Sequence, residues 1–201
     1  MESRNFVSRG IKCREEGGMK IVFLLEEPSM KYLLDELLPH ILPPDVTFQT
    51  IPHHGKRDLE KSIPRKLRGW TEPGDIRFVI LHDQDTKDCI QLKRDLLQLC
   101  AVTDRPCLVR IACQEMEAWY FGDIEVLCSA YNQPKLKAVT EKKKFRIPDA
   151  ISNPKEALYK LIPDHQQISG AKRVAPYMDI DRNTSVSFQQ FVRGVRQMVS
   201  R

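Results

Sequence analysis

The feature that most constrains the fold is an apolar run at residues 78–81 that leads into two acids, Asp83 and Asp85, one residue apart. An earlier run at residues 21–25 ends in the same way on Glu26. An uninterrupted apolar run is typical of a strand that is buried on both faces of a parallel sheet. Ligands of such sheets collect just beyond the carboxyl ends of the strands. The two runs therefore predict a parallel sheet with acids where a site would form.

Strand and helix patterns alternate along the first 120 residues. Strands are expected at Lys20–Leu25, 46–51, 78–81 and Cys107–Ala112. Helical spacing of apolar residues begins at Pro28, at Leu59 with an interruption near Pro64, and at Cys89. This order predicts an α/β fold with a mostly parallel four-stranded sheet flanked by helices.

The chain length of 201 residues suits one main core with a smaller addition. We expect a flexible leader at 1–18, an α/β core at 19–120 and a helical annex at 121–201 packed on that core. No apolar run approaches the length of a membrane span, and the first 18 residues are too polar for a signal peptide. We therefore expect a soluble, cytoplasmic protein without membrane contact.

Positive charge is concentrated in the last third of the chain. Residues 134–201 contain 14 Lys and Arg against 6 Asp and Glu, so they carry +8, whereas the whole chain carries +5. A basic segment beside an acidic site suits a polyanion that lies over metal ions. By itself such a bias more often marks an ordinary solvated surface.

Acids at three predicted strand ends together indicate a metal site. Glu26 follows the first strand, Asp83 and Asp85 the third, and Glu115 and Glu117 the fourth. In a mostly parallel sheet we expect these ends to be neighbours on one edge. Crowded carboxylates repel one another, and a divalent cation balances them. Mg²⁺ is the expected ion because it takes oxygen ligands.

Each acid also has a structural explanation. Asp83 and Asp85 can cap the following helix, and Asp85, which precedes Thr86, fits that role well. Glu27 can complement the positive N-terminus of the helix after the first strand. Glu115 and Glu117 can face solvent on a short helix. Two acids one residue apart directly after a strand are harder to explain by capping alone.

Several familiar catalytic motifs are absent. The chain has neither G-x-x-x-x-G-K-[ST] nor G-x-G-x-x-G, so neither a nucleotide P-loop nor a dinucleotide-binding fold is indicated. The six cysteines include no C-x-x-C pair, which argues against a zinc site.

A strand ending in Glu followed by a strand ending in Asp-x-Asp resembles the TOPRIM metal-binding domain of topoisomerases, primases, recombination proteins and overcoming-lysogenization-defect nucleases. A narrower resemblance is to a TOPRIM-like family of bacterial proteins known chiefly as a domain of unknown function. It covers roughly residues 19–198. Its segments are Leu25-Glu26-Glu27-Pro28-Ser29, Gly55-Lys56-x-Asp58-Leu59, Asp83-Gln84-Asp85 with Cys89, Glu115-Met116-Glu117-Ala118-Trp119-Tyr120, Ser169-Gly170-Ala171-Lys172 and 183–188. Glu27 departs from the wider pattern, which has Gly after the first Glu, and is therefore a candidate additional ligand.

The resemblance implies a TOPRIM-like, Rossmann-like fold and phosphodiester cleavage that depends on Mg²⁺ or Mn²⁺. Asp83 and Asp85 would hold the metal, and Glu117, with Glu115, would complete the site or hold a second ion. Glu26 would be a metal ligand or would relay a proton to the leaving oxygen.

The expected substrate is DNA or RNA, with Lys56, Lys172 and Arg173 as phosphate contacts. Members of the family resemble partners of AAA- or ABC-type ATPases in phage-defence loci, and the chain can also form a homodimer. One alternative is a non-catalytic module that binds and regulates such an ATPase. Another is phosphoryl transfer or phosphatase action on a small nucleotide, which an enclosed pocket would favour.

Overall fold

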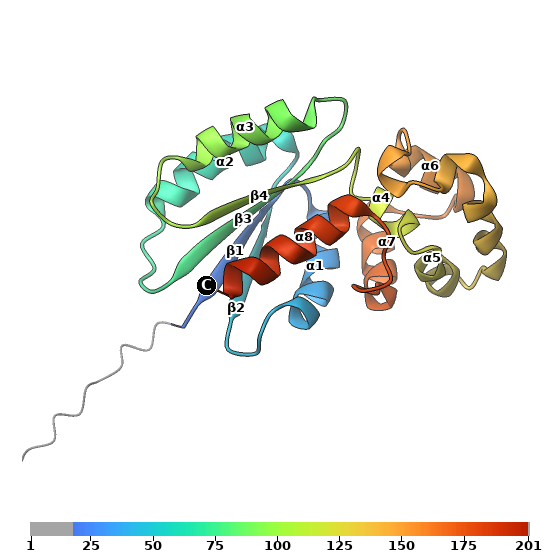
Figure 1. Ribbon diagram of the computed structural model, residues 1–201, viewed down its shortest axis with the longest axis horizontal. Coiled ribbons are helices and arrows are strands. Elements are labelled where there is room, and N and C mark those ends of the chain that lie inside the picture. The colour runs from blue at the N-terminus through green and yellow to red at the C-terminus, as the bar shows by residue number, and fades with distance from the viewer. Residues whose placement is uncertain (1–17, 201) are drawn as a thin grey trace, which may run out of the picture.

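The computed structural model describes residues 18–200, and its centre is a four-stranded sheet with helices on both faces (Figure 1). The strands are β1 (Lys20–Leu25), β2 (Thr47–Pro52), β3 (Ile76–Asp83) and β4 (Cys107–Ala112). They lie in the order β2-β1-β3-β4, and every neighbouring pair is parallel. The predicted fold class, a mostly parallel four-stranded α/β sheet flanked by helices, is confirmed. Residues 1–17 of the predicted leader lie outside the described residues.

The two central strands owe their apolar sequences to burial on both faces. Alternate residues of β1 and β3, including Val22, Leu24, Phe78 and Ile80, pack under α2 (Lys56–Gly69) and α3 (Cys89–Cys100). The intervening residues of the same strands belong to a second core cluster, on the face covered by α1 (Pro28–Ile41) and α8 (Val186–Val199). The apolar runs in the sequence are therefore the centre of a three-layer structure.

The helix expected to break near Pro64 is continuous, so that prediction was wrong. α2 begins at Lys56, three residues before the predicted start, and Pro64 lies inside it. A proline removes one backbone donor from a helix, but Leu59, Ile63 and Leu67 bury one continuous face against the sheet. This packing outweighs the missing hydrogen bond.

The residues after β4 form short helices beyond the carboxyl ends of the strands (Figure 1). They are α4 (Ala118–Phe121), α5 (Ile124–Tyr131), α6 (Pro154–Leu161) and α7 (Gln167–Val174), with short 3₁₀ helices at Pro134–Glu141, Lys143–Phe145, Pro148–Ala150 and Ala175–Tyr177. Their buried residues share one cluster with the α1 face of the sheet. α8 then returns to the sheet and packs against β4. The boundary predicted between residues 120 and 121 falls inside α4.

No helix within residues 18–200 combines the length and the apolar character that crossing a membrane requires.

Candidate functional site

The carboxyl ends of β1, β3 and β4 bring three acids together. Glu26 follows β1, Asp83 ends β3, and Glu117 follows β4 by five residues. The peptide N–H of Asp83 donates to Oε2 of Glu26 over 2.9 Å, and the N–H of Met116 donates to Oδ1 of Asp83 over 2.9 Å. The exposed fractions of Glu26, Asp83 and Glu117 are only 8%, 7% and 2%. The structure thus places these predicted residues side by side at one buried edge.

The crowding of these acids opposes their ionisation. Burial raises the pKa of Asp83 well above its usual range, and the nearby charges of Glu117 and Glu27 add to the shift. Burial also raises the pKa of Glu117 to about 7, with a further contribution from Glu27. A bound cation would relieve both effects because it stabilises the charged carboxylates.

Asp85 lies at the rim of the same edge, and it does not cap a helix. Its backbone has a left-handed φ of 52°, and Oδ2 of its carboxylate forms an ion pair with Nζ of Lys56 at 2.9 Å. The cap of α3 is Asp88, whose side chain accepts a hydrogen bond from the N–H of Gln91 over 2.7 Å. Helix capping therefore explains neither Asp83 nor Asp85.

Glu115, which follows β4, and Glu27, which follows β1, each accept a hydrogen bond from a residue in the last third of the chain. Glu115 accepts a hydrogen bond at Oε2 from the peptide N–H of Lys155 over 2.9 Å. Glu27 accepts hydrogen bonds from the hydroxyl of Ser29 and from the side-chain amide of Gln167. The charges of both acids raise the pKa of the buried Glu117, so both lie at the same acidic edge.

A buried histidine, His82, contacts the carboxylate of Glu26. The side chain of His82 is inaccessible to solvent, and its Nδ1 lies 3.0 Å from Oε2 of Glu26 and 2.5 Å from the carbonyl oxygen of Asp83. Both neighbours are acceptors, so Nδ1 carries the hydrogen. The other ring nitrogen faces Glu60 at 3.6 Å. His82 therefore helps to fix the position of the Glu26 carboxylate.

The three predicted phosphate contacts lie in different surroundings. The N–H of Gly55, a residue with φ of 95°, donates to the carbonyl of Glu26, and this turn starts α2 with Lys56 at the acidic edge. The ammonium of Lys172 lies 4.1 Å from the centre of the Tyr32 ring. Arg173 donates to the carbonyl of Ala130 over 2.5 Å and stacks on Tyr131. Only Lys56 contacts one of the predicted acids.

Lys155, Gln167, His82 and Glu60 were not predicted as parts of the site. His82 directly precedes Asp83 at the predicted strand end, and this position was the one sequence signal that could have identified it as part of the site. Lys155 and Gln167 reach the acids only because α6 and α7 fold over the strand ends (Figure 1).

As they stand, no three His, Cys, Asp or Glu side chains within residues 18–200 are placed to bind one metal ion together. Instead, the carboxylates of Glu26, Asp83, Glu27 and Glu115 accept hydrogen bonds from the protein. Binding of an ion would require these carboxylates to turn from their present partners.

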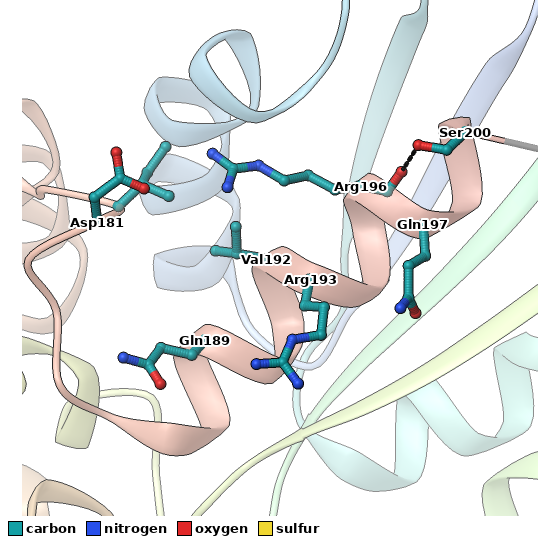
Figure 2. A pocket seen from close by; sticks show the side chains of 8 residues that line it. Asp181, Gln189, Val192, Arg193, Arg196, Gln197 and Ser200 are labelled. Atoms are coloured by element: carbon teal, nitrogen blue, oxygen red, sulfur yellow. Dashed lines mark hydrogen bonds between the residues drawn. The ribbon is translucent and has the colours of Figure 1, made fainter.

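A separate hollow of about 490 Å³ lies on the outer side of α8 (Figure 2). Arg193 and Arg196 project from the helix beside it, and Asp181 lies opposite. None of the acids at the strand ends lines this hollow, so it is not part of the candidate site.

The fold is similar to that of one solved structure, the C-terminal region of the Burkholderia pseudomallei OLD protein. The two chains share 19% sequence identity with a TM-score of 0.50, and the match covers 90% of this chain and 98% of that one. At this identity the likeness establishes the fold. No curated protein matches the chain. The model of one family, described as a domain of unknown function (DUF4276), matches residues 25–196, and the chain belongs to that family.

Proposed function

We propose that this protein is a cytoplasmic phosphodiester hydrolase that cleaves DNA or RNA with the help of Mg²⁺ or Mn²⁺. The observation that carries the proposal is the meeting of Glu26, Asp83 and Glu117 at the buried carboxyl edge of the sheet. The likeness to the region of the OLD protein supports it at the level of the fold.

The donor set fits a hard divalent cation in its chemistry. All the candidate ligands are carboxylates, which Mg²⁺ and Mn²⁺ accept, and two of them resist ionisation in the absence of a cation. Asp83 and Asp85 would hold the ion, and Glu117, with Glu115, would complete the set. For this, Asp85 would leave its ion pair with Lys56, an exposed pair that contributes little to stability.

In the proposed reaction a water oxygen forms a bond to phosphorus while the bond from phosphorus to the leaving oxygen breaks. When bound, the divalent cation would stabilise the charge on the phosphate and lower the pKa of the water. Glu26 would relay a proton to the leaving oxygen, and its carboxylate is held by contacts with His82 and with the N–H of Asp83. The products are a phosphomonoester and a free hydroxyl group.

Basic side chains near the acidic edge favour a polyanionic substrate. Besides Lys56, a hollow of about 630 Å³ on the annex is lined by Lys143, Lys144 and Arg146. Ser152, also in this lining, precedes by three residues the Lys155 whose N–H contacts Glu115. A nucleic-acid strand that extends from the acidic edge along the start of α6 would therefore meet a basic surface.

The test is cleavage by the purified full-length protein with Mg²⁺ or Mn²⁺ and labelled single-stranded DNA, double-stranded DNA and RNA. We expect the double variant Asp83→Ala, Asp85→Ala to lose cleavage. Asp95→Ala, which changes an exposed acid on α3, is the matched control and should keep it. Cleavage that survives the double variant would refute the assignment.

A non-catalytic role is the second candidate, and one observation favours it: within residues 18–200 the acids do not form a ready three-ligand site. In that case the chain would bind and regulate a partner ATPase of the AAA or ABC type, in phage defence as the family resemblance implies. Retention of an ATPase in a pull-down, together with full biological activity of the Asp83→Ala variant, would favour this role over the nuclease.

A further inference from the structure

The basic hollow on the annex also contains an exposed apolar side chain. Its volume is about 630 Å³, and Ile147 and Ala150 line it together with Lys143, Lys144, Arg146 and Ser152. The side chain of Ile147 is 64% exposed. A volume of this size lies in the range of about 300–1,000 Å³ that ligand sites occupy. The hollow is therefore large enough for one nucleoside beside the three cations.

Two contacts hold this hollow at a fixed place beside the acids. The ring of Phe145, which is buried, stacks on Phe121 of α4 with the ring centres 5.2 Å apart. On its other side the chain runs from the hollow into α6, where the N–H of Lys155 donates to Glu115 over 2.9 Å. Both contacts reach the segment 115–121, which follows β4 and carries two of the acids. The hollow is thus anchored to the acidic edge at two points.

The backbone of Ile147 is held in place although its side chain is exposed. Its neighbours Phe145 and Pro148 are both buried, and its carbonyl accepts a hydrogen bond from the N–H of Ala150 over 3.0 Å. A side chain on a fixed backbone loses little freedom when a ligand binds to it. Ile147 is therefore a preformed contact for an apolar surface of a ligand.

The three cations of the hollow have no acidic partner. Within residues 18–200, no carboxylate oxygen lies within 4.0 Å of the charged nitrogens of Lys143, Lys144 or Arg146. The carboxylate of Asp149 is turned toward the start of α8, from which it accepts its hydrogen bonds. The residues that line the hollow include no acid. These charges therefore favour an anionic ligand such as a phosphate group.

We infer that this hollow binds an unpaired nucleotide of the substrate, so that the protein acts on single-stranded nucleic acid. In a single strand, an unstacked base can lie against Ile147 while the neighbouring phosphates contact the cations. A duplex keeps its bases stacked inside and presents phosphates and sugars on its outer surface, so it would leave Ile147 without a partner. The inference rests on the proposed phosphodiester hydrolysis and names the class of its substrate.

The experiment measures binding of the full-length protein in EDTA, where the proposed cleavage does not occur. One labelled sequence is offered as a single strand and as a blunt duplex. We expect the wild type to bind the single strand about tenfold more tightly than the duplex. Ile147→Ser should lower the affinity for the single strand about fivefold and leave that for the duplex unchanged. Ile90→Ser is the matched control, since Ile90 is also 64% exposed but lies on α3, and it should change neither affinity.

Ile147→Tyr provides a gain that a misfolded protein cannot give. Its ring can stack on a base, so it should bind the single strand about threefold more tightly than the wild type. Equal affinities of the wild type for the two forms, or an equal loss for both in Ile147→Ser, would overturn the inference. So would equal rates of cleavage of single strand and duplex with Mn²⁺, although hydrolysis itself would then stand. A wild type that prefers the single strand but cleaves no nucleic acid with Mn²⁺ would instead overturn the proposed hydrolysis and support binding at the hollow.

Discussion

Oε2 of Glu26 accepts a hydrogen bond from the peptide N–H of Asp83 over 2.9 Å, and this contact joins the ends of two neighbouring strands. The same oxygen lies 3.0 Å from Nδ1 of the buried His82. One carboxylate thus meets two buried donors, and its removal leaves the N–H of Asp83 without an acceptor, whereas Nδ1 of His82 keeps the carbonyl oxygen of Asp83. Glu26 therefore holds the acidic edge together as well as belonging to it.

This contact predicts a difference between two uncharged variants of Glu26. Glutamine retains an oxygen acceptor at the position, whereas alanine does not. We expect Glu26→Ala to be less stable than Glu26→Gln by about 1–3 kcal/mol, the usual cost of buried polar groups without partners. Urea denaturation in the presence of EDTA measures the difference, and equal stability of the two variants would contradict the role of the carboxylate.

The buried Glu117 predicts that the metal-free protein loses stability as the pH rises. Its folded pKa of about 7 lies above the ordinary value of 4.5, so between these values the folded state binds more protons than the unfolded state. Stability is then fully present below about pH 4.5 and falls, by on the order of 3 kcal/mol, up to about pH 7. Glu117→Gln should flatten this slope in urea denaturation between pH 4.5 and 8. An identical slope in the variant would show that Glu117 ionises normally.

The cap of α3 predicts different effects for two acids in one loop. Asp88→Ala removes the side chain that accepts from the N–H of Gln91 and should cost about 1 kcal/mol. Asp85→Asn should change stability by less than about 0.5 kcal/mol, because asparagine tolerates the left-handed backbone and the ion pair with Lys56 is exposed. Thermal unfolding tests both. A larger loss of stability in Asp85→Asn than in Asp88→Ala would mean that Asp85, and not Asp88, has the capping role.

The basic hollow predicts a change in the salt dependence of nucleic-acid binding. In an Asp83→Ala background, the triple variant Lys143→Gln, Lys144→Gln, Arg146→Gln should reduce the slope of log affinity against log salt by about 2, since each phosphate contact on a single strand contributes about 0.7. Fluorescence anisotropy with a labelled single-stranded oligonucleotide measures this slope. The salt concentration is varied between about 50 and 200 mM, a range in which such slopes are about linear.

The control for that experiment is a triple variant of the same charge change on α2, at Lys61, Arg65 and Arg68. These side chains are exposed on α2, which covers the face of the sheet opposite α1 and α8. Equal reductions of the slope in both triple variants would mean that overall charge, and not the hollow, governs binding.

The sequence was most informative where local pattern and burial coincide. The runs at residues 21–25 and 78–81 predicted the central strands because a strand buried on both faces has no polar positions. Since parallel strands end at one edge, the same runs also located Glu26 and Asp83. The position of Asp88 as the cap was missed because Asp85 fits the same local rule.

The contributions of the annex could not be predicted from local pattern. Lys155 and Gln167 are separated from their partners Glu115 and Glu27 by 40 and 140 residues. Contacts over such separations depend on how helices pack, and helical periodicity gives the buried face of a helix but not its neighbour. Arg173 contacts the C-terminal part of α5, and its expected contact with phosphate stays a prediction.

The contacts of Gln167 with Glu27 and of Lys155 with Glu115 also fix when the site is completed during synthesis. All four strands have been made once residue 112 has been added to the chain, yet the groups that donate to Glu115 and Glu27 come 43 and 55 residues later. Domains generally fold as units, and the helices after β4 share one core cluster with the α1 face of the sheet, so the covered site forms only when these helices have been made. A chain truncated before α6 therefore lacks both of these donors.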